Sequence, residues 1–219
     1  MTTLKEHLIS LLFEHGIIET NFSQPFTLKS GIRSPIYCDF RLCTSHHPMM
    51  AIISNLFDFE TSQKIINVEN DIDIIFGVAI GAIPHSTLFA SDKEKPSAYI
   101  RPGAIAKEHG KKKIFEGCKI ENIVGKNIIL IEDLVSTGGS ILENALILRE
   151  LGAKEIFLWS IFSYNFEEAL EKFEINNFKF NSLLNINDIA PFLKERISKA
   201  DYTNLINWTA DPKGWYSNY

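Results

Sequence analysis

The chain has 219 residues, 45% hydrophobic and 22% charged, which is typical of a globular protein with one full-sized core. Its formal net charge of −5 at pH 7 argues against nucleic acid or an anionic membrane as the main partner, so any anion site must be local. The three cysteines lack metal-ligand spacing, and no run approaches the roughly 20 apolar residues of a membrane span, so we expect a cytoplasmic protein.

Residues 1–16 place leucines at helical spacing with charged residues between them, which predicts a packed amphipathic helix rather than a signal peptide. Residues 26–41 contain a Lys-Ser-Gly-Ile-Arg-Ser-Pro turn between apolar flanks. This pattern predicts a hairpin that lies outside the main sheet and forms a small lid, or hood.

The rest of the chain alternates apolar, β-branched runs with helical segments. The predicted buried strands are 72–79, 127–131 and 155–162, and the predicted helices are 84–91 and 140–151, with Gly152 as a C-cap. Strand, helix and strand in this order predict an α/β fold with a mainly parallel sheet flanked by helices. We expect one domain over residues 1–219, with a hood formed mainly by residues 1–45 and part of the C-terminus.

The most informative segment is 127–140, NIILIEDLVSTGGS, which reads as a strand, two acids, a loop of small residues and a helix start. Loops at the carboxyl ends of parallel strands present successive N–H groups to anions, backed by a helix N-terminus. The loop Ser136–Ser140 therefore predicts a phosphate site. Glu132 and Asp133 would repel a bare phosphate, but they suit a ribose 5-phosphate, because carboxylates accept hydrogen bonds from ribose hydroxyls and stabilise a cation at the anomeric carbon.

This segment resembles the 5-phosphoribosyl 1-pyrophosphate motif of type I phosphoribosyltransferases, whose fold we therefore expect. No Gly-x-x-x-x-Gly-Lys loop or Gly-x-Gly-x-x-Gly turn is present to favour an ATPase or a dinucleotide-binding protein. The resemblance implies a binding site for 5-phosphoribosyl 1-pyrophosphate. On the strand and loop its residues are Glu132, Asp133, Leu134, Val135, Ser136, Thr137, Gly138, Gly139 and Ser140.

The hood segment FTLKSGIRSPIYCDFR, residues 26–41, resembles the N-terminal signature of the orotate phosphoribosyltransferases. By that resemblance Lys29 reaches both orotate and pyrophosphate, and Tyr37 and Cys38 help to form the base pocket. Ser136 of the phosphate loop would also contact orotate. Nothing in the sequence activates Cys38 as a nucleophile.

Residues 99–117, YIRPGAIAKEHGKKKIFEG, resemble the catalytic loop of the same family. The resemblance assigns Arg101, Lys107 and His109 to the pyrophosphate, where cations stabilise the charge that grows on the leaving group. With Asp133, Lys107 and His109 are the expected catalytic residues. In the family this loop closes over the neighbouring subunit's site, which implies a homodimer with shared active sites. Its Pro and Gly content predicts irregular structure.

Two segments depart from the family pattern. The loop after the strand 72–79 reads Ala79-Ile80-Gly81-Ala82-Ile83, where the family commonly has Ala-Thr-Ala-Gly-Ile. Because such loops bind pyrophosphate mainly through backbone N–H groups, we expect altered affinity more than lost function. The stretch between Arg101 and Lys107 is about two residues longer than usual, and Pro102 replaces a lysine that some members carry.

We therefore expect an orotate phosphoribosyltransferase that transfers ribose 5-phosphate from 5-phosphoribosyl 1-pyrophosphate to orotate with Mg²⁺, in pyrimidine biosynthesis. No dedicated protein ligand for Mg²⁺ is expected, because the ion would be held through the substrate, with Asp133 as the one candidate side chain. Two alternatives stay open. One is a transferase of the same fold that acts on a purine or another base, and the other is a noncatalytic regulator that binds 5-phosphoribosyl 1-pyrophosphate.

Overall fold

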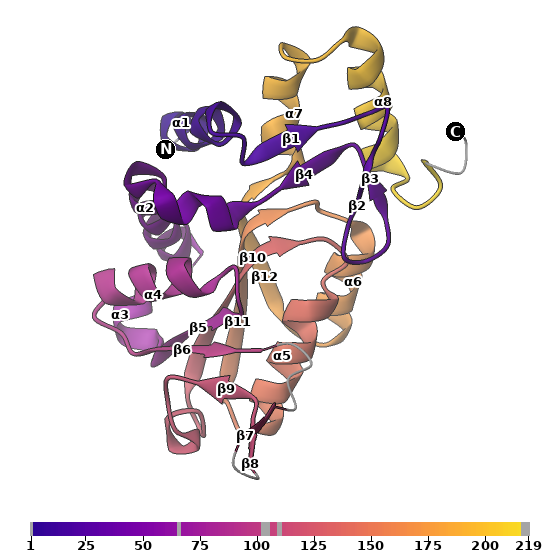
Figure 1. Cartoon of the computed structure of the whole chain (residues 1–219). Coiled ribbons are helices and arrows are strands. Elements are labelled where there is room, and N and C mark those ends of the chain that lie inside the picture. Colours follow the sequence, from indigo (N-terminus) through magenta and orange to yellow (C-terminus); the bar gives the residue numbers. More distant parts are fainter. Residues whose placement is uncertain (1, 65–66, 102–105, 109–110, 216–219) are drawn as a thin grey trace.

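The computed structural model describes residues 2–64, 67–101, 106–108 and 111–215 (Figure 1). Its central sheet has six strands, in spatial order β12 (Lys179–Asn185), β11 (Glu155–Ser163), β10 (Asn127–Val135), β5 (Ile74–Val78), β6 (Ser97–Ile100) and β9 (Phe115–Glu116). All neighbouring pairs are parallel except β6 with β9, which is antiparallel. The expected mainly parallel sheet is confirmed.

Helices cover both faces of this sheet, because successive strand residues point to opposite sides. The apolar cluster on the face of the sheet that continues into the hood is called the hood-side core. It contains Ile75 and Ile129 together with buried residues of α2 (His47–Gln63) and α4 (Ile83–Asp92). Ile74 and Ile128 belong to the α5-side core, which is completed by α5 (Gly139–Glu150) and α6 (Glu167–Ile175). The short helices α3 (Val68–Asp71) and η2 (Ile120–Asn122) lie in connections.

The hood combines segments from both ends of the chain (Figure 1). Its N-terminal elements are α1 (Thr2–Glu14), β1 (Ile18–Thr20), β2 (Phe26–Thr27), β3 (Arg33–Ser34), β4 (Ile36–Cys38) and η1 (Phe40–Ser45), and its C-terminal elements are α7 (Ile186–Lys194) and α8 (Lys199–Ala210). β2 and β3 form the expected antiparallel hairpin, and β1 pairs with β4. The indole Nε1 of buried Trp208 donates to the Arg33 carbonyl at 2.8 Å, which joins α8 to the hairpin.

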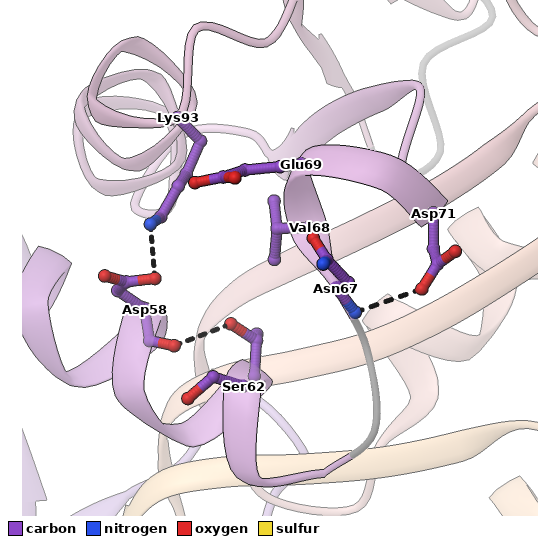
Figure 2. A pocket seen from close by; sticks show the side chains of 8 residues that line it. Asp58, Ser62, Asn67, Val68, Glu69, Asp71 and Lys93 are labelled. Carbon is purple, nitrogen blue, oxygen red and sulfur yellow. Dashed lines mark hydrogen bonds and ion pairs between the residues drawn. The ribbon is translucent and has the colours of Figure 1, made fainter.

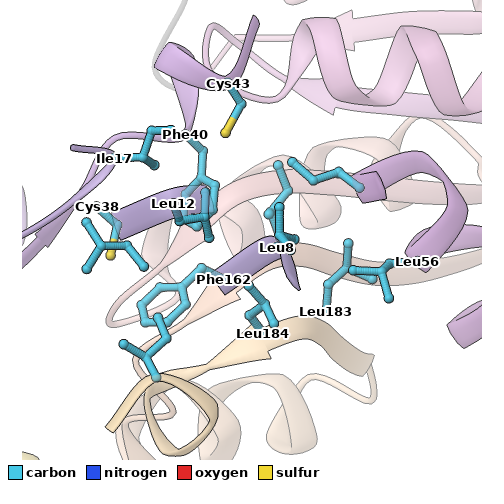
Figure 3. Packing of buried hydrophobic residues seen from close by; sticks show 14 of the residues in the cluster. Leu8, Leu12, Ile17, Cys38, Phe40, Cys43, Leu56, Phe162, Leu183 and Leu184 are labelled. Atoms are coloured by element: carbon cyan, nitrogen blue, oxygen red, sulfur yellow. The ribbon is translucent and has the colours of Figure 1, made fainter. Parts of the chain in front are cut away.

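The hood-side core is continuous from the hood to the sheet. Leu8 and Leu12 of α1 pack with Phe40 of η1 and with Phe162 of β11 in one cluster (Figure 3). These four side chains are at most 1% exposed. Because the same apolar cluster supports both parts, the hood is held in a defined position over the carboxyl ends of the strands.

Three differences from the sequence expectations concern strands. β10 runs four residues beyond Ile131, because β11 continues to pair with it as far as Val135 and Ser163. β6 and β12 were not predicted, since β6 is short and β12 mixes polar and apolar residues, and both are stabilised by pairing with neighbours. The catalytic loop was expected to be irregular, whereas β7 (Ala106–Glu108) and β8 (Lys111–Lys113) form an antiparallel pair.

β7 and β8 pair through their backbones, with Ala106 opposite Lys113 and Glu108 opposite Lys111. The residues that predicted irregularity, Pro102 and Gly103, lie outside both strands and outside the described residues. In Figure 1 the β7–β8 pair projects from the β9 side of the sheet, at the opposite end of the molecule from the hood.

Trp208 should be a main source of stability for the hood. Trp208→Ala would remove a fully buried indole, its ring contacts with Tyr164 and Phe166, and the hydrogen bond to Arg33. We expect urea denaturation to show a loss of about 3–5 kcal/mol in the free energy of unfolding. Ile206→Ala, in the same helix but with its side chain 44% exposed, is the control and should change it by less than about 1 kcal/mol. An equal loss of unfolding free energy in Trp208→Ala and Ile206→Ala would contradict this packing of Trp208.

Candidate active site

The site lies where the direction of chain connection reverses in the sheet. The chain passes from β5 through α4 to β6 on the hood side, and from β10 through α5 to β11 on the other face. Crevices form at the carboxyl ends of such neighbouring strands, and ligands of α/β proteins bind there. A cavity of about 720 Å³ opens at this point. It is lined by hood residues 27–30, 37–39 and 41, by 79–81 after β5, and by 132–141 with Glu143.

The loop after β10 has the geometry of a phosphate site. Gly138 has a φ of 74°, and a Cβ there would lie 2.7 Å from the Phe173 ring, so both the backbone and the packing require glycine. Ser136, Thr137 and Gly138 line the cavity, and their N–H groups have no acceptor among the residues that the structure describes. Unpaired N–H donors in a loop before a helix N-terminus, here that of α5, are the arrangement with which proteins commonly bind anions.

The two acids at the end of β10 face different parts of the site. Glu132 is 7% exposed, and its Oε2 accepts a hydrogen bond from Ser140 Oγ of α5 at 3.0 Å. Asp133 is half-buried and lies against Gly81, where a Cβ would come within 1.9 Å of Asp133 Oδ2. Asp133 Oδ1 accepts the Leu134 N–H at 3.0 Å. Glu132 therefore contacts the phosphate loop, and Asp133 contacts the loop that follows β5.

Burial changes the pKa of one acid of this pair, Glu132. Burial raises the pKa of Glu132 well above its usual value, and the neighbouring charge of Asp133 raises it further. Ser140 opposes this rise by donating to the carboxylate. A buried acid with a raised pKa beside a second acid is costly to fold, and such pairs cluster at functional sites.

The hood contributes the residues expected to contact a base. Lys29 is exposed at the cavity, and Tyr37 stacks on Phe26 with ring centroids 5.4 Å apart. Cys38 also lines the cavity, but its side chain is 5% exposed and burial raises the pKa of its thiol. The thiol therefore stays protonated and is not an activated nucleophile.

The predicted site residues divide into two groups. Lys29, Tyr37, Cys38 and every residue from Glu132 to Ser140 line one cavity. Arg101 does not line this cavity, and its Nη2 lies 3.3 Å from Glu116 Oε1 of β9. Of Lys107 only the backbone is described, in β7, and His109 lies outside the described residues.

Sequence reasoning missed several residues of the cavity. Arg41 was not assigned a role although it ends the hood signature, and Gly81 was treated only as a departure from the family pattern. No spacing in the sequence shows that either lies near Asp133, because the hood and the two strand ends meet only in the folded chain. His85 of α4, which does not line the cavity, is 1% exposed, and its Nε2 lies 3.1 Å from the Phe40 carbonyl.

A second hollow, of about 510 Å³, lies between α2, α3 and α4 (Figure 2). Its side chains already contact one another, since Lys93 pairs with Asp58, and Asp71 accepts the Asn67 N–H at 3.1 Å. Within the described ranges no group of three or more His, Cys, Asp or Glu could hold a metal ion, and no helix is long and apolar enough to cross a membrane.

Comparison with known proteins identifies first the class and then the family. A scan against protein-family models found no match. The fold matches an orotate phosphoribosyltransferase from Aeropyrum pernix with a TM-score of 0.71 at 23% identity, covering 86% of this chain and 98% of that one. It matches the UMP synthase of Leishmania donovani with a TM-score of 0.73 at 20% identity, and the match covers 95% of this chain and 42% of that one. The chain therefore has the type I phosphoribosyltransferase fold.

The chain shares a higher sequence identity with several curated relatives than with these two structures. The chain is 36% identical over 217 residues to an orotate phosphoribosyltransferase of Lactobacillus johnsonii, covering 96% of each protein. It is also 36% identical over 207 residues to that of Staphylococcus epidermidis, covering 94% of this chain and 98% of the relative. This protein belongs to the orotate phosphoribosyltransferase family, and the resemblance stated from its hood and loop motifs is confirmed.

Glu132 should lower stability at neutral pH. Because folding raises its pKa, the folded chain binds a proton more tightly than the unfolded chain does, and above the raised pKa the full cost of the buried charge is present. We expect Glu132→Gln to increase the free energy of unfolding at pH 8 by about 0.5–2 kcal/mol. The gain should shrink as the pH falls through the raised pKa towards the ordinary value of 4.5.

Denaturant titrations between pH 5 and pH 8 measure this difference. Glu143→Gln, an exposed carboxyl group on the same cavity, is the control and should change stability by no more than about 0.5 kcal/mol. If Glu132→Gln proved less stable than the unaltered chain at every pH, the Glu132 carboxylate would be a structural group.

Proposed function

We propose that this chain transfers the ribose 5-phosphate of 5-phosphoribosyl 1-pyrophosphate to N1 of orotate, giving orotidine 5′-monophosphate and pyrophosphate. The observation that carries the proposal is one cavity that joins the hood residues Lys29 and Tyr37 to Asp133 and the phosphate loop. The curated relatives are named for the same activity. We also propose that the reaction serves pyrimidine biosynthesis in the cytoplasm.

The described residues suit the two ends of the phosphoribosyl group. The N–H groups of Ser136, Thr137 and Gly138 bind the 5-phosphate at the N-terminus of α5. Lys172, whose Nζ donates to the Thr137 carbonyl at 3.3 Å, adds a positive charge beside this loop. Asp133 accepts hydrogen bonds from the ribose hydroxyls and stabilises positive charge at the anomeric carbon as its bond to pyrophosphate lengthens. Glu132, which contacts Ser140, holds the first turn of α5 beside the ribose.

Orotate would enter between the hood and the phosphate loop. Lys29 supplies a positive charge for the orotate carboxylate, and the aromatic ring of Tyr37 offers a flat apolar wall to the base. Ser136 provides a small polar contact at the other side of the cavity. The substrates are bound in adjacent positions, so the entropic cost of bringing N1 to the anomeric carbon is met on binding.

The donor set also fits Mg²⁺, which prefers oxygen ligands and commonly binds through phosphates and one or two carboxylates. The cavity presents the Asp133 carboxylate, and its Oδ2 lies against the loop that follows β5. We propose that Asp133 is the protein group nearest to a Mg²⁺ carried by the pyrophosphate. When bound, the ion neutralises charge on the leaving group.

We further propose a homodimer in which the segment with Arg101, Lys107 and His109 completes the partner's site. The support is its position: the β7–β8 pair projects from the opposite end of the molecule from the hood (Figure 1), and Arg101 does not line the cavity of its own chain. In the partner's cavity the Lys107 ammonium would neutralise the departing pyrophosphate, a contribution that grows as the bond breaks.

The base specificity can be tested directly. We expect turnover only when orotate, 5-phosphoribosyl 1-pyrophosphate and Mg²⁺ are all present, because the hood pairs a cation with a carboxylated base. Loss of orotate absorbance measures the rate, with adenine and hypoxanthine as alternative acceptors. Turnover of a purine with orotate left unchanged would favour the first alternative. Tight binding of 5-phosphoribosyl 1-pyrophosphate without turnover of any base would favour a noncatalytic regulator.

Lys107 should contribute mainly to the rate. We expect Lys107→Ala to lower kcat by a factor on the order of 10²–10³, with a smaller rise in KM, because its contact strengthens in the transition state. Lys112→Ala, in the facing strand, is the matched control and should retain most of the activity. A rise in KM with unchanged kcat would show that Lys107 only binds substrate.

Mixing variants tests whether the site is shared. Asp133→Asn should also be nearly inactive, and a hybrid dimer with Lys107→Ala would contain one site with an intact Asp133 and an intact Lys107. We expect subunit exchange between the two inactive proteins to restore activity, up to about one quarter of the unaltered specific activity if subunits mix at random. Hybrid dimers that form, as seen by mass spectrometry, yet stay inactive would exclude a shared site.

A further inference from the structure

The cavity holds more negative than positive side chains, although both proposed substrates are anions. Among the described residues that line it, the carboxylates are Asp39, Glu132, Asp133 and Glu143, and the cations are Lys29 and Arg41. Lys29 was expected from the hood motif, whereas Arg41 has no role in the reaction outlined above. A cation in such a cavity is a strong candidate to contact substrate.

Arg41 is held in one orientation by Asp39. Its Nε donates to Asp39 Oδ1 and its Nη2 to Asp39 Oδ2, both at 2.6 Å. Guanidinium has five N–H donors, so three remain, including both on Nη1, and none of these has an acceptor in the part of the chain that the structure describes. The Arg41 side chain is 61% exposed, so its pair with Asp39 adds little stability but fixes the direction of the free donors.

The backbone around Arg41 is fixed next to the loop that follows β5. The carbonyl of Phe40, the preceding residue, lies 3.1 Å from Nε2 of His85 in α4, and α4 begins directly after that loop. The charge of Asp133 contributes to raising the pKa of Arg41, which places the guanidinium within electrostatic reach of that carboxylate. Arg41, Asp133 and Gly81 therefore share one wall of the cavity.

That loop has anion donors but no cation of its own. The N–H groups of Ile80 and Gly81 have no hydrogen-bond acceptor among the described residues. Ile80 is 78% exposed, and neither its side chain nor those of Ala79, Gly81 and Ala82 carry charge. Two N–H groups alone balance little of the charge on a pyrophosphate. Besides the Mg²⁺ and the Lys107 segment proposed above, a positive side chain from the same cavity would therefore strengthen binding at this loop.

We propose that Arg41 is a substrate-binding residue that contacts the pyrophosphate of 5-phosphoribosyl 1-pyrophosphate through its Nη1 edge, together with the N–H groups of Ile80 and Gly81. The hood thus supplies the cation that this loop lacks, and Asp39 sets the orientation of the guanidinium. The inference rests on the proposed function for the identity of the ligand.

Direct binding tests it without any turnover. Calorimetry would measure the affinity of the unaltered chain and of Arg41→Gln for Mg²⁺-pyrophosphate and, separately, for ribose 5-phosphate, which lacks the pyrophosphate. We expect Arg41→Gln to weaken pyrophosphate binding roughly 10- to 100-fold, because a charge-assisted hydrogen-bond pair is lost, and to leave ribose 5-phosphate affinity within about twofold. Arg41→Lys, which keeps the charge but not the planar fork, should recover part of the loss.

Lys199→Gln, exposed on α8 of the hood and outside the cavity, changes the net charge by the same amount and should leave both affinities unchanged. Equal pyrophosphate affinity in Arg41→Gln and the unaltered chain would overturn the proposal. An equal loss for ribose 5-phosphate would also overturn it, since the substitution would then act on the whole site or on folding. So would a rise in KM for orotate alone, which would place Arg41 at the base. Failure of the proposed function would appear instead as an unaltered chain that binds pyrophosphate without consuming orotate.

Discussion

The structure of the site depends on placing two adjacent carboxylates beside an anion-binding loop. Two neighbouring acids repel each other and the phosphate, and burial in a medium of low polarity increases both costs. The end of β10 reduces this conflict by directing Glu132 to Ser140 of α5 and Asp133 to the loop that follows β5. Glu132 then contacts the first turn of α5, while Asp133 lies at the cavity beside the loop that follows β5.

The hood also serves the charged groups at this site, because it partly closes the crevice to water. A crevice that binds substrates at the ends of strands is open to water, yet the reaction requires charge to be neutralised in a partly dry site. Segments from both chain ends close one side of the crevice. They are joined by the Trp208 hydrogen bond to Arg33 and by the apolar cluster that contains both Leu8 of α1 and Leu205 of α8. Lys29 and Arg41 are thereby presented from a surface that is built into the main core.

Local patterns in the sequence predicted those structural elements whose residues follow one another along the chain. The order of residues 127–140 predicted a strand, a loop and a helix start, which the structure contains, and the apolar runs predicted three of the six sheet strands. β6 and β12 were missed because pairing with neighbours, rather than their own composition, makes them strands. Arg41 was missed for a similar reason, since its neighbours across the cavity are 38 or more residues away along the chain.

The loop after β5 shows how a departure from a family pattern can be consistent with its site. The family commonly has Thr-Ala-Gly where this chain has Ile80-Gly81-Ala82. Here the position of Gly81 has no room for a Cβ, because Asp133 Oδ2 would lie 1.9 Å from it, whereas Ala82 is accommodated in the hood-side core. Glycine and alanine have therefore exchanged places around the Asp133 carboxylate. Ile80 lacks the hydroxyl of the family's threonine, while the N–H groups of Ile80 and Gly81 remain without an acceptor among the described residues.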